Sequence, residues 1–224
     1  YDYFIESTGV STDTRQIRPG NIFFALKGES FDGNKFVQKA LDTGASYAVV
    51  DDPQLSKEKN CLYFQDSLVA LQELATLHRS KLNIPVIGIT GSNGKTTTKE
   101  LIREVLGQKY QTYATKGNLN NHIGVPLSIL DVKIVVEIAV IEMGANHVGE
   151  IDFLCKIAQP THGVITNIGR AHLEGFGGYE GVKKAKGELY QWLKAKNGTF
   201  FINKDDDTLK EMLPEDVKSK KYGL

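Results

Sequence analysis

The stretch VIGITGSNGKTTTKE, residues 86–100, constrains the possible fold of this chain more than any other segment. It begins with an apolar, strand-like run, passes through a turn that contains Gly91 and Gly94, and continues into TTTKELIREVLGQK (96–109), whose apolar spacing is helical. The turn therefore lies between a buried strand and a helix. A chain built around this unit is expected to form a sheet with helices packed on it.

Strand-like and helical segments alternate on both sides of this turn. Before it, the sequence predicts strand 21–26, helix 34–45, strand 47–51 and helix 67–82. From Pro85 on, it predicts strand 85–90, helix 96–109, strand 135–144, helix 149–158, strand 163–168, helix 180–193 and strand 199–203. Such alternation favours parallel sheets with helices on their faces. We expect an α/β protein with a small N-terminal α/β domain over residues 1–83 and a second, mostly parallel-sheet domain over residues 84–224.

Composition and charge limit the function classes. The chain has 224 residues, 41% hydrophobic and 24% charged, as in ordinary soluble globular proteins. Lys plus Arg and Asp plus Glu both number 27, so the overall electrostatic field does not favour binding to nucleic acid or to an anionic membrane. Any anion binding has to come from a local arrangement of residues. No apolar run is long enough to insert into a membrane, and Cys61 and Cys155 have no metal-like spacing. We therefore expect a cytoplasmic protein.

The glycine turn has the composition of a phosphate-binding loop. Small residues at the end of a strand let backbone N–H groups converge on an anion, and the next helix directs its positive end at the same point. Lys95 is placed to reach the outer phosphates, and the Thr96 hydroxyl to ligate Mg²⁺. The usual pattern has glycine where Ile89 stands, so only its second half matches; the alternative is an ordinary turn with a solvated lysine. We expect nucleoside triphosphate to be bound by Gly91, Ser92, Asn93, Gly94, Lys95, Thr96 and Thr97.

Two residues that follow predicted strands are candidate metal ligands. Phosphoryl transfer needs a metal ion, and the metal needs carboxylate or imidazole ligands. Glu142 ends the apolar run 135–144 and is expected at the carboxyl edge of the sheet, where open α/β sheets bind ligands. His172 follows strand 163–168 and is expected at the same edge. The alternatives are a structural, helix-capping role for Glu142 and a loop hydrogen bond for His172.

Five segments together resemble the central ATP-binding domain of the Mur ligases: GITGSNGKTTT, KGNLNNHIGVPLSIL, VIEMGANHVGEI, THGVITNIGRAHLEGFG and GVKKAKGEL. The segment STDTRQIRPGNIFFALKGESFDGNKFVQKALDTGASYAVV resembles the UDP-binding domain of the same family. Within the family, GNLNNHIGVP and EMGANHVGEI are similar to the members that add D-alanyl-D-alanine to UDP-N-acetylmuramoyl-tripeptide. Members that add single amino acids usually have a threonine-rich segment at the first of these places.

The resemblance implies a role for each candidate residue of the second domain. Lys95 binds the ATP phosphates, Thr96 and Glu142 ligate one Mg²⁺, and His172 helps to ligate a second. Lys186 falls where family members carry a lysine carbamylated by CO₂, which turns a cation into an anion that bridges toward the second Mg²⁺. Carbamylation needs a neutral amine, and a lysine desolvated near other cations has a lowered pKa. From the residues alone, Lys186 reads as a solvated helix position like its lysine neighbours.

The resemblance also implies the substrate-binding residues. Asn118, Asn120 and Asn121 lie in a turn that touches the muramoyl-peptide substrate; loop and helix-capping roles are the alternative for each. Thr14 and Arg15 fall where the family contacts uridine diphosphate, and the planar arginine fork suits a diphosphate. A surface salt bridge is the competing interpretation for Arg15.

The implied reaction is ATP-dependent amide formation through an acyl phosphate. The family has a further C-terminal domain that binds the incoming D-alanyl-D-alanine. The charged segment 204–224 stops without completing the expected sheet, so we expect a shortened chain that is inactive alone. The alternatives are a Mur ligase that adds a single amino acid, a ligase like folylpolyglutamate synthase, which normally lacks the N-terminal domain, and a non-enzymatic nucleotide-binding module. A kinase or GTPase would need an N-K-x-D motif or a lid with catalytic arginines, which the sequence lacks.

Overall fold

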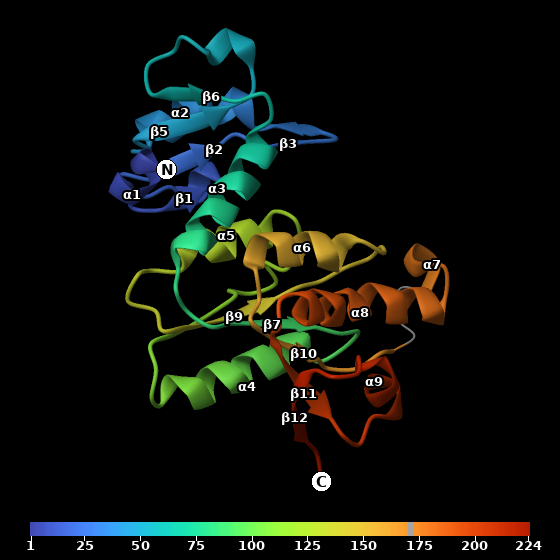
Figure 1. Ribbon diagram of the computed structural model, residues 1–224. Helices are drawn as coiled ribbons and strands as arrows, with labels where there is room; N and C mark the ends of the chain where they lie inside the picture. Colours follow the sequence, from blue (N-terminus) through green and yellow to red (C-terminus); the bar gives the residue numbers. More distant parts are fainter. Residues whose placement is uncertain (170–172) are drawn as a thin grey trace.

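The structure is a computed structural model that describes residues 1–169 and 173–224. Two α/β units lie one above the other, and helix α3 (Ser67–Lys81) runs from the upper, N-terminal unit down to the lower one (Figure 1). The chain begins in the upper unit and ends at the far side of the lower one (Figure 1). Among the helices of the described ranges, none combines the length and apolar character needed to cross a membrane.

The upper unit is built on a small parallel sheet. Its strands, in order across the sheet, are β1 (Val10–Ser11), β2 (Ile22–Phe24), β5 (Tyr47–Val50) and β6 (Cys61–Tyr63). The other elements are α1 (Asp2–Glu6), the 3₁₀ turns η1 (Thr14–Gln16), η2 (Gly33–Phe36) and η3 (Pro53–Leu55), α2 (Val37–Asp42), and a hairpin of β3 (Lys27–Gly28) and β4 (Phe31–Asp32). Side chains alternate along β2: Phe23 packs with α2, whereas Ile22 and Phe24 face the core that contains α3. Both faces are thus buried.

The lower unit is built on a larger, wholly parallel sheet. Its order across the sheet is β12 (Lys218–Tyr222), β11 (Thr199–Asn203), β10 (His162–Ile165), β7 (Val86–Thr90), β9 (Ile138–Glu142) and β8 (Thr112–Ala114). Its helices are α4 (Lys95–Gly107), α5 (Gly124–Asp131), α6 (Glu150–Ala158), α7 (Leu173–Phe176), α8 (Tyr179–Ala195) and α9 (Asp207–Met212). The strand order reverses at β7, because later strands are added on both of its sides. Ligands of such sheets bind beyond the carboxyl ends of the strands at that point.

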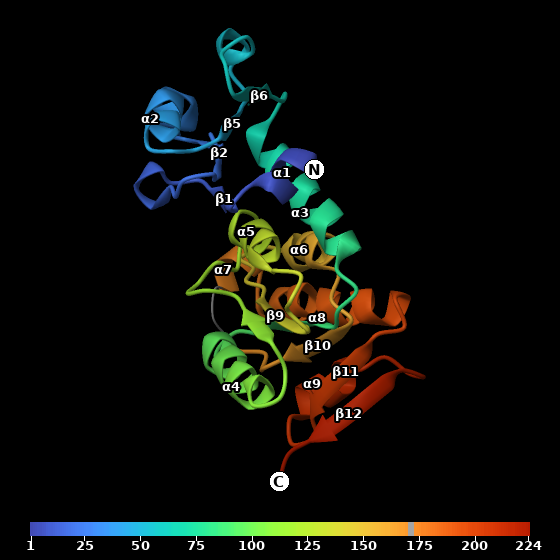
Figure 2. The same ribbon diagram turned by 90° about the vertical axis from the view of Figure 1, so that its left-hand side faces the viewer.

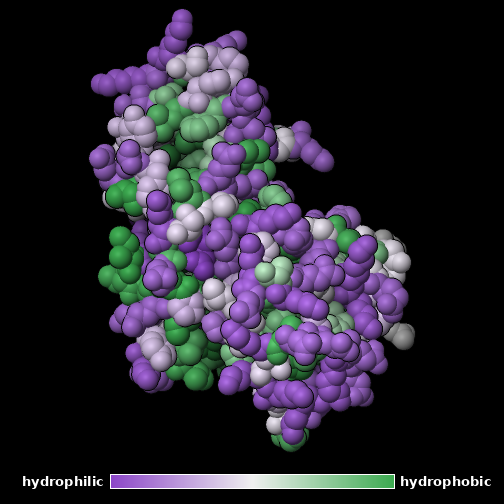
Figure 3. Space-filling view, viewed as in Figure 1, coloured by the Kyte–Doolittle hydropathy of each residue, from purple (hydrophilic) through white to green (hydrophobic). Residues whose placement is uncertain are grey.

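Helices cover the two faces of the large sheet unequally. α5, α6 and α8 pack on one face, where Ala139 and Ile141 of β9 belong to the main core. Val140, the residue between them, points to the other face, which α4 covers (Figure 2). On that second face, α4 leaves Leu101 and Val105 exposed, and apolar surface is visible around α4 (Figure 3).

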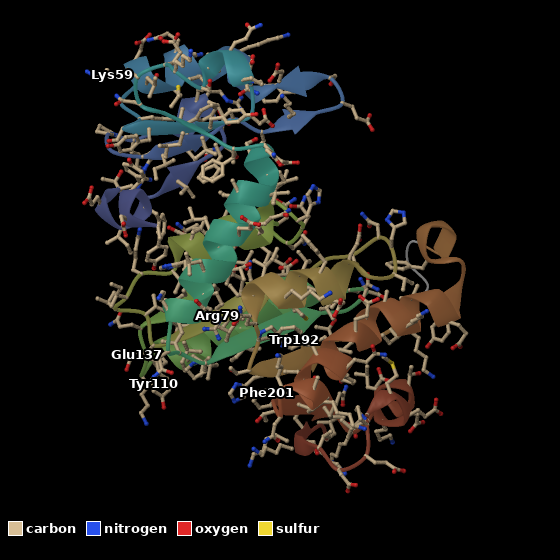
Figure 4. All side chains as sticks on the ribbon, turned by 45° about the horizontal axis from the view of Figure 1, so that its top comes forward. Lys59, Arg79, Tyr110, Glu137, Trp192 and Phe201 are labelled. Carbon is tan, nitrogen blue, oxygen red and sulfur yellow. The ribbon has the colours of Figure 1, made fainter. Side chains whose placement is uncertain are left out.

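Helix α3 connects the two units through polar side chains as well as its apolar face. Gln72 Nε2 donates to the carbonyl of His122 at 3.0 Å. His78 is buried, with Nε2 3.0 Å from the Val132 carbonyl and Nδ1 3.0 Å from the hydroxyl of Tyr1. Arg79 lies at the end of α3 that faces the lower unit (Figure 4). The helix is therefore bonded to loops of the large-sheet unit.

The structure confirms the alternation and the α/β class but shifts several boundaries. The predicted helix 34–45 is a 3₁₀ turn followed by the short α2. The predicted strand 135–144 shrinks to β9, and Ile134 and Val135 before it are exposed. Segment 204–224, for which the sequence predicted no helix or strand, contributes α9 and β12, which pairs in parallel with β11. The side chains of Lys218, Lys220 and Lys221 in β12 are exposed.

Candidate active site

The glycine turn after β7 is held by the loop that follows β10. Backbone N–H groups of Ser92 and Asn93 donate to the carbonyl and the side-chain oxygen of Asn167, both at 3.1 Å. Asn167 Nδ2 and Thr166 Oγ1 donate back to the Asn93 carbonyl at 3.0 and 2.6 Å. Gly91 has φ +139° and lies so close to Thr166 that a Cβ at this position would collide with it. The turn is therefore rigidly shaped, and glycine is required at its start.

Helix α4 begins directly after this turn. Gly94, at φ +77°, occupies the N-cap position in the left-handed region, and no side chain of the described residues caps the helix. The first N–H groups of a helix have no intrahelical acceptor, and together with the helix dipole they attract anions. Lys95 Nζ donates to the carbonyls of Gly91 and Ser92 at 2.9 and 3.4 Å. The lysine is thus folded back over the turn, where phosphate oxygens could replace these acceptors.

Glu142 lies at the carboxyl end of β9, as predicted, and is 1% exposed. One carboxylate oxygen accepts from Thr96 Oγ1 at 2.9 Å, and the other accepts from Asn120 Nδ2 at 2.9 Å. The carboxylate is therefore joined to both the start of α4 and the loop after β8, and it caps no helix in the part of the chain that the structure describes. Hydroxyl, amide and carboxylate oxygens are the ligands that Mg²⁺ prefers, so these residues fit the predicted metal.

Lys186 is a buried residue of α8 rather than a solvated one. Its ammonium donates to the carbonyl of Ala145 at 3.1 Å and lies 5.2 Å from the ring centre of Phe176. Burial and, to a smaller extent, the nearby charge of Lys95 lower the pKa of Lys186 to about 8, against the opposing effect of Glu150 and Glu188. The neutral amine is thus accessible near physiological pH.

A pocket of about 500 Å³ brings these segments together. Its lining comes from the glycine turn (Gly91, Ser92, Lys95), the loop after β8 (Asn120, Asn121, His122), the segment after β9 (residues 144–146 and 148–150), α6 (Phe153, Leu154), and Phe176, Val182 and Lys186. Polar groups from three strand ends therefore surround one cavity at the point where the strand order reverses. His172 lies outside the described residues. In the described part of the chain, no three His, Cys, Asp or Glu side chains form a metal cluster.

The three predicted asparagines have different surroundings. Asn120 lines the pocket and bonds to Glu142. Asn121 also lines the pocket, but its side-chain oxygen accepts from the N–H groups of Ile123 and Gly124 at 3.1 and 2.8 Å, which is the capping arrangement at the start of α5. Asn118 is exposed, and its carbonyl accepts from the N–H of Asn120 at 2.7 Å.

The predicted N-terminal site is separate from this pocket. Thr14 and Arg15 form η1, and Arg15 makes the surface ion pair that was the competing interpretation, with its Nη2 2.6 Å from Asp13 Oδ2. A second pocket, of about 420 Å³, lies beside η1 between the two units. The upper unit contributes residues such as Ser11, Asp13 and Arg18, and the lower unit contributes Tyr113, Lys116 and Asp131. Neither Thr14 nor Arg15 lines it.

Sequence reasoning missed two residues of the site. Asn167 holds the glycine turn, and it could have been found because it lies near the carboxyl end of the predicted strand 163–168, at the same sheet edge. Lys99, one turn into α4, is completely buried beside Glu142, with its Nζ 3.9 Å from Oε2. No sequence signal distinguishes it from the exposed lysines of other helices.

Comparison with known protein families identifies the chain. Residues 89–224 match the model of the Mur ligase middle domain, and residues 6–89 match that of the Mur ligase family, catalytic domain. The chain belongs to the Mur ligase family.

Two individual relatives of this Mur ligase chain have the same name. It is 42% identical over 217 residues to the UDP-N-acetylmuramoyl-tripeptide–D-alanyl-D-alanine ligase of Bacillus subtilis, covering 96% of this chain and 47% of that protein. The Escherichia coli ligase of the same name is 42% identical over 198 residues, covering 88% of this chain and 43% of that protein. The chain thus spans about half the length of the curated relatives it matches.

Two similar solved structures are both named MurF. MurF from Acinetobacter baumannii superposes with a TM-score of 0.86 and 39% identity, covering 96% of this chain and 48% of that one. MurF from Thermotoga maritima, solved in complex with ADP, has a TM-score of 0.87 and 35% identity, covering all of this chain and 51% of that one. The α/β fold of this Mur ligase chain is therefore that of the corresponding half of those proteins.

Proposed function

We propose that this chain is part of an ATP-dependent ligase that adds D-alanyl-D-alanine to UDP-N-acetylmuramoyl-tripeptide in the cytoplasmic synthesis of peptidoglycan precursors. The observation that carries the proposal is the convergence of the glycine turn, the Thr96–Glu142 pair and Lys186 at one edge of the large sheet. The names of the relatives and the ADP bound by one of them support the same reaction.

The reaction is an amide synthesis in two steps. The terminal carboxylate of the tripeptide attacks the γ-phosphate of ATP, which forms an acyl phosphate and releases ADP. The amine of D-alanyl-D-alanine then attacks the activated carbonyl carbon, and phosphate leaves. No protein nucleophile is needed. The contribution of this chain is to position the phosphates and to offset the charge that spreads over the transferring group, through Lys95 and the start of α4.

Thr96 and Glu142 would hold one Mg²⁺ against the nucleotide phosphates. When bound, the metal neutralises charge on the transferring phosphoryl group. His172 would serve a second Mg²⁺ together with Lys186. Reaction of the neutral Lys186 amine with CO₂ would form an N–C bond and release one amine proton to solvent, which leaves an anionic carbamate. The lowered pKa of Lys186 supplies that amine at a pH where an ordinary lysine is almost fully protonated.

The UDP-muramoyl substrate would extend between the two pockets. The pocket between the units has basic side chains, Arg18 and Lys116, for a diphosphate, and it lies beside η1 with Thr14 and Arg15. Arg15 would have to exchange its Asp13 partner for the ligand, a change that an exposed side chain can make cheaply. Asn118, Asn120 and Asn121 lie on the loop between this pocket and the glycine turn, which suits contact with the peptide.

Calorimetric titration of the chain with three ligands tests the proposal. We expect binding of UDP-N-acetylmuramoyl-tripeptide, weaker binding of the dipeptide analogue, and binding of ADP with Mg²⁺. Lys95→Met should weaken ADP binding by about tenfold or more, because it removes the point charge over the turn. Lys184→Met, which removes an exposed lysine of α8, is the matched control and should bind ADP normally. A folded chain that binds no uridine nucleotide would contradict the assignment to this reaction.

A further inference from the structure

Lys99 is a lysine for which the proposed reaction has no role. It lies one turn into α4, and none of its surface is exposed. Burying an ammonium group is costly unless charges and hydrogen bonds compensate it. A side chain of this kind in a helix that faces the site therefore requires an explanation.

The partners of Lys99 come from the loops that build the cation site. Its Nζ donates to the carbonyls of Thr115 and Gly117 at 2.6 and 3.2 Å. Both carbonyls belong to the segment between β8 and Asn120, the residue that bonds Glu142. Lys99 thus fixes the start of the loop whose amide group orients the carboxylate.

Among the residues that the structure describes, the charge of Lys99 has one buried counterpart, Glu142. Nζ lies 3.9 Å from Glu142 Oε2, and both side chains are 1% exposed. Glu100, 3.0 Å away, is 43% exposed, so water screens that pair more strongly. Thr96 donates to the same Glu142 oxygen at 2.9 Å. The ammonium therefore lies beside the carboxylate that would ligate Mg²⁺, at a distance where unscreened charges interact strongly.

From this geometry we propose that Lys99 is a positioning residue that substitutes for the divalent cation at Glu142. While no metal is bound, it balances the buried carboxylate and holds the loop 115–120 in the shape the site requires. Its positive charge also opposes the binding of a free divalent cation, so the metal enters together with the nucleotide phosphates, which bring compensating negative charge. This inference rests on the proposed nucleotide and Mg²⁺ site.

Thermal unfolding with and without millimolar Mn²⁺, in the absence of nucleotide, tests the inference on the chain as it exists. Lys99→Met fills the same space without charge, and Lys99→Gln is also neutral but keeps a hydrogen-bond donor. In both variants we expect Mn²⁺ to bind about tenfold more tightly than in the wild type, which raises Tm by about 4 °C. For the wild type and for the charge-retaining Lys99→Arg, the shift should stay below about 1 °C.

Lys109→Met is the matched control, because it removes an exposed lysine just beyond α4 and changes the net charge equally. It should respond to Mn²⁺ as the wild type does. If Lys99 had only a structural role, the neutral variants would have a lower Tm that Mn²⁺ leaves unchanged, and the inference would be overturned.

A parallel titration with ADP and Mn²⁺ separates the two proposals. Intact ADP binding without a Mn²⁺ response in the neutral variants overturns only the role of Lys99, whereas no ADP binding by the wild type overturns the proposed site itself.

Discussion

At the scale of single residues, the site keeps three lysines in three different states. Lys95 is folded over the glycine turn on backbone carbonyls, Lys99 is buried against Glu142, and Lys186 is buried against Ala145 and the Phe176 ring. Burial of Lys186, reinforced by the charge of Lys95, lowers its pKa to about 8. The same residue type thus provides the proposed phosphate contact, the proposed counter-charge and an amine that loses its proton easily.

The lowered pKa of Lys186 predicts how stability changes with pH. Below pH 8, the lysine is protonated in both the folded and the unfolded chain, and the folded state bears the full cost of burying the charge. Between about pH 8 and pH 10.5, only the unfolded chain retains the proton, so the wild type gains stability relative to Lys186→Met, by up to about 3 kcal/mol. Urea unfolding at several pH values measures this difference. The exposed Lys184→Met should show no such trend, and a difference between wild type and Lys186→Met that is constant with pH would refute the shift.

At the scale of elements, buried polar groups determine where helices end and meet. Arg79, near the end of α3, is 6% exposed and donates to carbonyls of its own helix end and of the end of α6. The distances are 2.7 Å to Leu82, 2.9 Å to Ala158 and 3.1 Å to Gln159. Carbonyl groups at the end of a helix have no N–H partner within that helix, so these three depend on donors from elsewhere. One guanidinium group therefore joins the end of α3 to the end of α6.

Replacing Arg79 should consequently be costly. Arg79→Met leaves several buried carbonyls without donors and should lower the free energy of unfolding by about 3 kcal/mol. Arg79→Lys restores the charge but not the planar fork, and it should recover less than half of the loss. Arg103→Met removes an exposed arginine of α4 and should change stability by less than about 0.5 kcal/mol. Equal effects of the Arg79 and Arg103 substitutions in urea unfolding would show that the carbonyl contacts do not matter.

Elements with a clear apolar period were predictable, whereas those defined by tertiary contacts were not. Residues 85–109 form the predicted strand and helix because periodicity and glycine placement agree. β1, β6 and β8 have two or three residues each, too few for a period to show. Helix α5 was not predicted because Gly124 and Pro126 are typical of turns, although a proline in the first turn of a helix loses no hydrogen bond.

At the site, Glu142 was predicted from its place after an apolar run. Lys99 was not, because its carbonyl partners lie 16 and 18 residues away along the chain.

At the scale of the whole molecule, the two sheets share one apolar core. Ile22, Phe24 and Val49 of the small sheet belong to the same cluster as Ile129 and Met143 of the large-sheet unit. The connection runs through α3, where Leu71 and Ala75 are completely buried. Because the pocket beside η1 has walls from both units, their relative placement also sets the geometry of the proposed uridine site. The units are therefore expected to depend on each other for stability.

This shared core predicts one cooperative unfolding transition instead of two. Leu71→Ala removes a large, completely buried side chain of α3 and should lower the free energy of unfolding by about 3 kcal/mol for both units together. The fluorescence of Trp192, the only tryptophan and a residue of α8 (Figure 4), reports on the large-sheet unit. Hydrogen exchange of Phe23 and Phe24 reports on β2 in the small sheet. Both probes should give the same urea midpoint, and Leu71→Ala should lower the two midpoints equally. The control Leu101→Ala, at a side chain that is 62% exposed, should leave both midpoints unchanged. If the β2 amides exchange at a lower urea concentration than the one at which Trp192 fluorescence changes, the small sheet unfolds on its own, and α3 does not couple the two units.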